Sequence, residues 1–164
     1  MATAIVTPDQ DAVIADIFIA APPERVFKAI TDPTQLTQWW GQKGMYRSKK
    51  WEADLRPGGK WRCDGLNDKG DPFTVEGDYL EVDPPRRLVY TWIAPWAGSL
   101  KTTVHWELTP SNNGTKVNLH HTGFKTLPDA ARNHGEGWTR VLGWMQAYAE
   151  RGETVDSREA VNIG

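Results

Sequence analysis

The sequence lacks the features that mark several large classes of protein. It has a single cysteine, Cys63, so no disulfide within the chain is possible. No segment approaches the roughly 18 consecutive apolar residues expected of a membrane-spanning helix. Residues 1–18 contain no basic stretch followed by an apolar core, so we expect no signal peptide and a cytoplasmic location.

The sequence also lacks the patterns typical of nucleic-acid, metal and phosphate sites. The formal net charge is -2, and charges of both signs are spread along the chain without a basic stripe. We therefore expect no nucleic-acid partner. His134 and Glu136 are two residues apart and His120 is adjacent to His121, which matches no zinc spacing. There is no nucleophile elbow and no phosphate-binding glycine loop, so we expect no metal and no cofactor.

Tryptophan is what the sequence has in abundance, with 9 residues in a chain of 164. A chain of this length suits one domain with a full core. Each tryptophan brings a large apolar body and one N–H group that needs a partner when buried. Composition leaves two interpretations open, a tryptophan-rich core and the aromatic walls of a binding cavity.

The first part of the chain predicts one strand and two short helices. Residues 13–20 are rich in isoleucine, valine and phenylalanine, which favours a strand. Residues 23–31 show helical spacing of apolar residues after a proline that suits a first turn. Asp32 precedes Pro33 and so avoids the helical region, which separates this helix from a second one at about 33–40.

From residue 51 to residue 122 apolar and polar residues alternate, which predicts antiparallel strands with one apolar face and one wet face. Turn signals rich in proline, glycine and asparagine separate the runs, including an Asn-Gly signal near residue 113. The predicted strands are 50–55, 59–65, 73–82, 87–93, 100–109 and 115–122.

The last predicted element is a long amphipathic helix over 128–151, with Gly152 just past its end. A helix with one apolar stripe needs an apolar surface to cover. We therefore predict an α+β fold in which a curved antiparallel sheet of about seven strands wraps around this helix. Residues 1–12 form an N-terminal extension, 13–152 the domain, and 153–164 a polar, loose tail.

The alternation places most of the large aromatic residues on the face that meets the long helix. We predict that they line a cavity between sheet and helix, because stiff rings at an imperfect fit tend to surround a space. The predicted ligand-binding residues are Trp40, Trp51, Trp61, Tyr79, Tyr90, Trp92, Trp106, His121, Trp138, Leu142 and Met145.

Five segments, in this order and spacing, carry a family resemblance. They are IFIAAPPERVFKAITDPTQLTQWWG, DLRPGGKWRC, GDYLEVDPPRRLVYTW, TTVHWELTPSNNGTKVNLHHTGF and GEGWTRVLGWMQAYAE. Across about residues 13–150 the chain resembles the START-like (SRPBCC) superfamily, whose members share the helix-grip fold. Within it the chain is most similar to the subfamily named after the C-terminal domain of the activator of the heat-shock-protein-90 ATPase.

The resemblance implies the same fold and leaves three functions open, since a fold hosts functions without naming one. The preferred hypothesis is binding of a small hydrophobic or aromatic molecule. The first alternative is an enzyme of the cyclase or aromatase type in the same cavity, with His121 and Tyr79 or Tyr90 as acid and base. A lone inward histidine is more often a hydrogen-bonded core residue. The second alternative is an interaction module that activates a chaperone ATPase or serves a stress response.

Two further expectations concern tryptophans outside the strands. The resemblance implies that Trp39 is structural, wedged between the short helices and the sheet. We expect its neighbour Trp40 to turn toward the rim of the cavity. Trp96 lies in the loop APWAGS, where we expect its side chain to be exposed. An exposed aromatic side chain of this kind is compatible with a homodimer.

Overall fold

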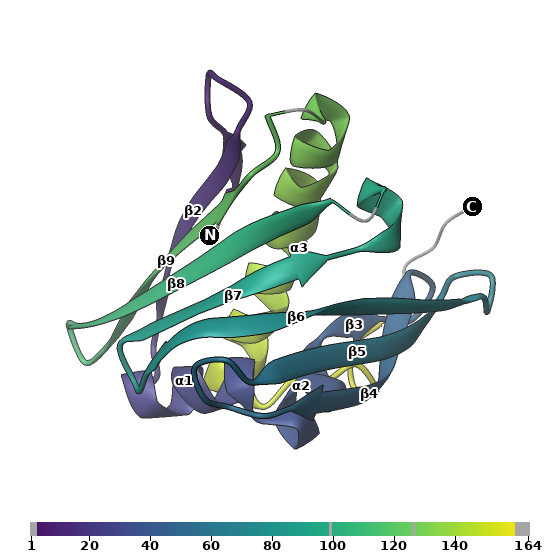
Figure 1. Cartoon of the computed structure of the whole chain (residues 1–164). Coiled ribbons are helices and arrows are strands. Elements are labelled where there is room, and N and C mark those ends of the chain that lie inside the picture. Colours follow the sequence, from purple (N-terminus) through teal and green to yellow (C-terminus); the bar gives the residue numbers. More distant parts are fainter. Residues whose placement is uncertain (1–2, 99, 126, 160–164) are drawn as a thin grey trace.

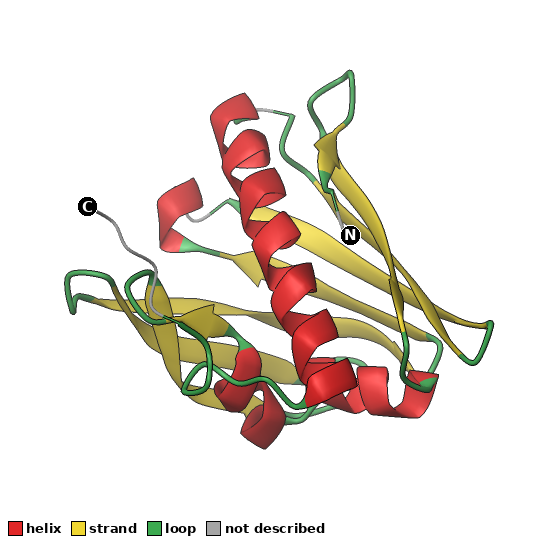
Figure 2. Ribbon diagram, turned by 180° about the vertical axis from the view of Figure 1, so that it is seen from behind, coloured by secondary structure: helices red, strands yellow, loops and turns green. Residues whose placement is uncertain are grey.

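The computed structural model describes residues 3–98, 100–125 and 127–159, and within them nine antiparallel strands form one curved sheet. A long helix, α3, crosses the concave face of this sheet, and two short helices lie at one end of it (Figure 1, Figure 2). This arrangement confirms the predicted fold class. The order of strands across the sheet is β1-β2-β9-β8-β7-β6-β5-β4-β3.

The bounds of the elements are close to those expected from the sequence. The helices are α1 (Pro23–Thr31), α2 (Pro33–Trp39) and α3 (Pro128–Arg151), with the 3-10 turn η1 (Pro95–Ala97). The strands are β1 (Ile5–Val6), β2 (Ala12–Ile19), β3 (Gly41–Gln42), β4 (Tyr46–Ala53), β5 (Lys60–Asn67), β6 (Pro72–Asp83), β7 (Arg87–Ile93), β8 (Lys101–Ser111) and β9 (Gly114–Thr122).

The two strands beyond the predicted seven are β1 and β3. Each has two residues, which is too short to carry an alternating pattern. Strand β1 lies in the predicted N-terminal extension and pairs with Val13 and Ile14 of β2, and β3 pairs with the first residues of β4.

Asp32 forms the junction between α1 and α2. Its extended backbone ends α1 while its N–H donates to the carbonyl of Lys28. Its carboxylate accepts from the N–H of Thr34 and so caps α2, in which Pro33 takes the first position. One residue thus ends one helix and begins the next, and this brings α2 across the end of the sheet.

Strands β8 and β9 are joined by a tight turn, as predicted. The turn lies one residue earlier than the Asn113-Gly114 signal indicated. The turn residues are Asn112 and Asn113, both with positive φ, and Ser111 pairs with Gly114. A two-residue hairpin loop needs this left-handed backbone, which asparagine tolerates. Helix α3 ends at Gly152, whose φ of 71° lets its N–H reach the last carbonyls of the helix.

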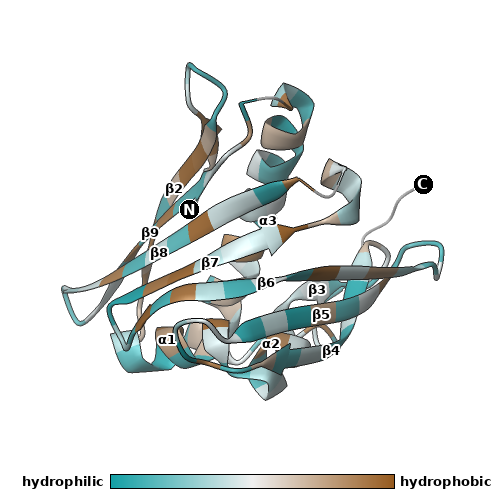
Figure 3. Cartoon of the chain, viewed as in Figure 1, coloured by the Kyte–Doolittle hydropathy of each residue, from teal (hydrophilic) through white to brown (hydrophobic). Residues whose placement is uncertain are grey.

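The sheet separates two chemical faces. In Figure 3, viewed from the side away from α3, teal and brown residues alternate along the strands. The outer face carries exposed ion pairs such as Lys60 with Asp78 and Arg62 with Asp64. The inner face meets α3, where Leu119, Leu142 and Met145 are fully buried. Burial of this apolar surface is the main contribution to stability.

The tail was expected to be loose, and for residues 153–159 this prediction is wrong. Val155 is fully buried, and its N–H donates to the carbonyl of Gln38 at 2.8 Å. The Arg158 guanidinium donates to the carbonyls of Trp39 and Gly41 and lies over the ring of Trp144. Apart from Val155, these anchors are contacts of a polar side chain with backbone carbonyls and with the Trp144 ring, which apolar periodicity does not report.

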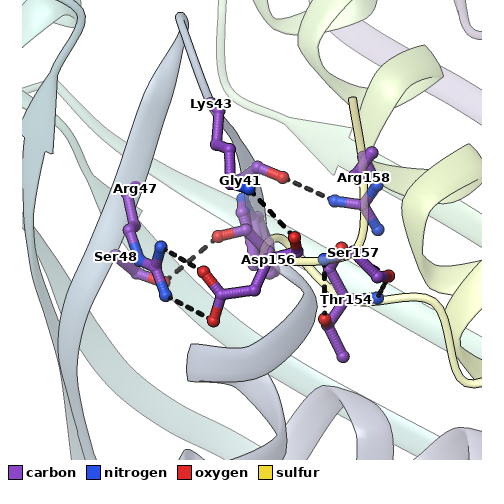
Figure 4. Close-up of polar contacts among 9 residues, drawn as sticks. Gly41, Lys43, Arg47, Ser48, Thr154, Asp156, Ser157 and Arg158 are labelled. Atoms are coloured by element: carbon purple, nitrogen blue, oxygen red, sulfur yellow. Dashed lines mark hydrogen bonds and ion pairs between the residues drawn. The ribbon is translucent and has the colours of Figure 1, made fainter. Parts of the chain in front are cut away.

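Ion pairs and a local turn complete the attachment of the tail, as Figure 4 shows. The guanidinium of Arg47 on β4 makes a two-pronged contact with Asp156, at 2.7 and 3.1 Å. Lys43 donates to the Asp156 carbonyl at 2.9 Å. Thr154 and Ser157 close the turn between them by reciprocal hydrogen bonds. The chain after α3 is therefore tied to the β3–β4 edge of the sheet.

Candidate ligand-binding site

A cavity of about 740 Å³ lies between the N-terminal half of α3 and strands β4 to β7, with η1 at its edge. This size falls in the range of small-molecule sites. Its walls are mostly apolar. The lining residues are Trp40, Met45, Tyr46, Ser48, Trp51, Cys63, Asn67, Asp68, Phe73, Val75, Trp92, Pro95, Trp96, Asn133, His134, Gly137, Trp138, Arg140 and Val141.

Two local features leave this space open. The register of β4 against β5 shifts between Ser48 and Lys50, and such a bulge bends and twists a strand. On the opposite wall, Gly137 presents no side chain, and a Cβ built there would meet no atom within 4 Å. The bulge also explains how Tyr46 and Trp51, an odd number of residues apart, both face the cavity.

Trp40 is the central aromatic residue of the wall. Its ring lies 5.3 Å from that of Trp51, 6.3 Å from that of Trp92 and 5.8 Å from that of Trp138. It therefore joins α2, the sheet and α3 in one aromatic surface. Its neighbour Trp39 is fully buried and donates to the carbonyl of Ala29 in α1, which places it in the structural position that the resemblance implies.

Three further aromatic rings of the wall come from separate segments, Tyr46 from β4, Phe73 from β6 and Trp96 from η1. Phe73 on β6 lies 6.0 Å from the ring of Tyr46 and 5.7 Å from that of Trp96. Trp96 is 53% exposed, and its indole donates to His134 Nε2 at 3.4 Å. This loop tryptophan thus borders the cavity. The structure holds one chain, and the homodimer stays a prediction.

Seven tryptophan N–H groups donate to protein acceptors within the described residues. They are those of Trp39, Trp40, Trp61, Trp92, Trp96, Trp106 and Trp138. Trp51 and Trp144 are not among them, and the Nε1 atom of Trp51 is buried with no partner in the part of the chain that is described. An unpaired buried donor is costly, and this one belongs to a residue of the cavity wall.

His121 is a fully buried member of a hydrogen-bonded chain. Trp138 Nε1 donates to His121 Nδ1 at 2.9 Å, and an indole is a donor only, so the imidazole proton is on Nε2. That proton is donated to Thr102 Oγ1 at 2.6 Å. The Thr102 hydroxyl then donates to the carbonyl of Trp92. Burial holds the pKa of His121 well below its ordinary value, helped by the nearby His134 and His105.

His134 is also held neutral, but at the wall of the cavity. Its Nδ1–H donates to the carbonyl of Ala130 at 2.8 Å, so Nε2 is the acceptor. Nε2 accepts from Trp92 at 3.2 Å and from Trp96 at 3.4 Å. Burial lowers the pKa of His134, although the bond to Ala130 works in the opposite direction. Both ring nitrogens are occupied by protein groups.

The structure divides the residues predicted to bind a ligand into two sets. Those in the cavity wall are Trp40, Trp51, Trp92 and Trp138. Those buried in the core outside the wall are Trp61, Tyr79, Tyr90, Trp106, His121, Leu142 and Met145. His121 has no free nitrogen and no place in the wall. A catalytic role for it stays a prediction that this geometry does not favour.

Several residues of the wall were outside the predicted site. Tyr46 was missed because the strand was expected to start at residue 50, whereas β4 starts at Tyr46. Gly137 and Arg140 carry no apolar signal. Asn133, Gly137 and Arg140 follow one another at intervals of four and three residues, so they lie on one side of α3. Trp138 is next to Gly137 in the sequence, and this spacing is the signal that could have identified these residues as part of the wall.

The rim of the cavity is polar. Asn67 ends β5, Asp68 lies in the turn that follows, and Asn133 and Arg140 come from α3. Inside, burial raises the pKa of the Cys63 thiol above its ordinary value, so Cys63 is a protonated, weakly polar group. The arrangement is an apolar space with a few polar groups at its opening.

No three histidine, cysteine, aspartate or glutamate side chains within residues 3–98, 100–125 and 127–159 are grouped so that they would hold a metal ion. In the same ranges no helix has the length and apolar character needed to cross a membrane.

The curved sheet, the helix across it and the cavity between them define a START-like helix-grip domain. The chain belongs to the family described as "Activator of Hsp90 ATPase homolog 1-like protein", whose model matches residues 20–150. No curated protein matches the sequence.

Solved structures of similar fold come from several bacteria. A protein from Chromobacterium violaceum is 30% identical, with a TM-score of 0.75, over 85% of this chain and 97% of that one. A protein from Rhodobacter sphaeroides is 19% identical with a TM-score of 0.78, over 90% and 97% of the two chains. CalU16 from Micromonospora echinospora is 24% identical with a TM-score of 0.66, over 93% and 85%. The last two show likeness of fold alone.

Proposed function

We propose that the protein binds a small hydrophobic, aromatic molecule in the cavity between α3 and strands β4 to β7. The observation that carries the proposal is an open space of about 740 Å³ whose walls include five indole rings. Such walls supply affinity through apolar contact and stacking, while a few polar groups set the orientation of the ligand. The cytoplasmic location stays a prediction.

Binding, rather than catalysis, is the function that the side chains support best. Of the groups with acid–base chemistry in the wall, His134 has both nitrogens engaged and Tyr46 is a half-buried, neutral phenol. Burial raises the pKa of Tyr46 above its ordinary value. A cyclase or aromatase would need a group with a pKa near the working pH beside the substrate.

Native mass spectrometry of the purified protein tests the proposal. We expect a bound molecule of low mass, or its uptake from a mixture of aromatic compounds. Gly137→Leu should abolish this complex because the new side chain extends into the cavity. Gly143→Leu is the matched control, since Gly143 is exposed on the same helix outside the wall.

The family description supports one alternative, in which the domain acts on a chaperone ATPase. The test is the ATPase rate of the chaperone with and without this protein. If the rate rises, and Gly137→Leu has no effect on any small-molecule complex, the interaction function replaces ligand binding. If aromatic compounds bind to the wild type and not to Gly137→Leu, ligand binding stands.

A further inference from the structure

Two hydrogen-bond donors in the wall of the cavity have no acceptor among the described residues. The Tyr46 hydroxyl oxygen accepts from Trp40 Nε1 at 3.1 Å, and its own proton is donated to no acceptor among the described residues. Trp51 Nε1 is unpartnered in the wall. The imidazole acceptor of His134 is already shared by Trp92 and Trp96. A ligand that offers acceptor atoms would match this wall.

Arg140 adds a positive charge at the opening. It lies on α3 one turn beyond Gly137, and arginine side chains on a helix reach back over the preceding turn. Among the described residues no carboxylate lies within 4.0 Å of its guanidinium, whereas Arg132 on the same helix pairs with Asp129. Within the described residues, Arg140 is therefore a cation without a carboxylate partner beside an apolar space.

Arg140 on α3 and Tyr46 on β4 line the same cavity, whereas Arg158 in the tail is already paired with Glu153 at 3.0 Å. Burial raises the pKa of Tyr46, and the hydrogen bond from Trp40 and the charges of Arg140 and Arg158 oppose that rise. Arg158 is buried, and its Nη2 has no partner within the described part of the chain. Asp68, in the turn after β5, is the one carboxylate among the described lining residues.

We infer that the ligand carries an anionic group, such as a carboxylate or sulfonate, which binds between Arg140 and Tyr46 while its aromatic body packs against the tryptophans. This inference rests on the proposed function and adds the charge of the ligand to it. Arginine and a phenol hydroxyl both donate to an anionic oxygen, and such charge-assisted hydrogen bonds are stronger than neutral ones.

Two fluorescent probes separate charge from shape. 1-Anilinonaphthalene-8-sulfonate and N-phenyl-1-naphthylamine share the same aromatic body, and the first alone has a sulfonate. We expect Arg140→Gln to raise the Kd of the sulfonate about fivefold, as for a partly exposed ion pair, and to change the Kd of the neutral probe less than twofold. Tyr46→Phe should have a smaller effect in the same direction.

Arg132→Gln is the matched control because it removes the same charge from the same helix outside the lining. The inference is overturned if Arg140→Gln and Arg132→Gln weaken the sulfonate equally, or if Arg140→Gln leaves it unchanged while the neutral probe still binds. In that case the proposed function survives. If neither probe binds the folded wild-type protein, the proposed function fails, and the inference fails with it.

Discussion

The space between α3 and the sheet has two halves, and they differ in how their rings meet the helix. In the closed half, around Trp106 and Met145, the side chains are fully buried and Trp106 donates to the Tyr90 hydroxyl at 3.0 Å. In the open half, around Trp40 and Trp96, rings of the same kind surround a cavity. Aromatic content therefore does not decide between core and cavity. The bend of β4 and the absence of a side chain at Gly137 are what keep one half open as a cavity.

The largest effect that we expect distinguishes the halves by stability. Trp106→Ala should lower the free energy of unfolding by about 3–5 kcal/mol, because it leaves a void and an unpaired Tyr90 hydroxyl in a closed core. Trp96→Ala should cost less than about 1 kcal/mol, since half of that ring is already in water. Urea unfolding of both variants measures this difference. Equal losses would mean that the two halves are packed alike.

The second prediction concerns the two neutral histidines that link the halves. Burial lowers the pKa of His121 and of His134 in the folded protein, whereas in the unfolded chain a histidine titrates near about 6.5. As pH falls below that value, the unfolded state takes up protons that the folded state does not. The free energy of unfolding should therefore fall, with a limit of about 1.4 kcal/mol per pH unit for each histidine.

Unfolding measured between about pH 7.5 and about pH 5.5 tests this point. Carboxylates that titrate near pH 4 in the unfolded chain contribute little in that window. His105, whose pKa burial also lowers, adds a smaller slope on the outer face. His134→Gln should remove part of the slope. A stability that does not change across the window would show that neither histidine is held neutral by the fold.

The smallest effect that we expect is that of Gly137→Ala, which should raise the stability of the protein and lower its affinity for a ligand. Gly137→Ala should stabilise the protein by up to about 1 kcal/mol through helix propensity, because its Cβ meets no atom. Gly143→Ala should stabilise by the same amount. The affinity for a neutral aromatic probe should fall for Gly137→Ala and stay constant for Gly143→Ala. Thermal melting and a fluorescence titration measure the two quantities. A fall in affinity for both variants would place the ligand elsewhere.

The fold was predictable because alternation and helical spacing report which face of each element is buried. Alternation put Trp51, Trp92 and Trp106 on the inner face, and they lie there. The alternation of apolar and polar residues does not report the distance between the inner face of the sheet and α3. Trp106 and Trp92 were therefore predicted to have one role, although only Trp92 lines the cavity.

Other parts of the site were not predictable for local reasons. The bulge between Ser48 and Lys50 breaks the alternation that would have included Tyr46. The anchoring of Arg158 depends on backbone carbonyls of residues that are distant in sequence, which leave no pattern. Arg140 is an exposed arginine on a helix, and only the cavity beside it distinguishes it from the other surface arginines.

Fluorine NMR of the protein labelled with 5-fluorotryptophan tests the two-halves account most directly. Single Trp→Phe variants assign the signals of the 9 tryptophans. On saturation with N-phenyl-1-naphthylamine, we expect the signals of Trp40, Trp51 and Trp96 to shift, and those of Trp39 and Trp106 to stay in place. Shifts of Trp39 and Trp106 as large as those of the cavity residues, or no shift at saturation, would contradict it.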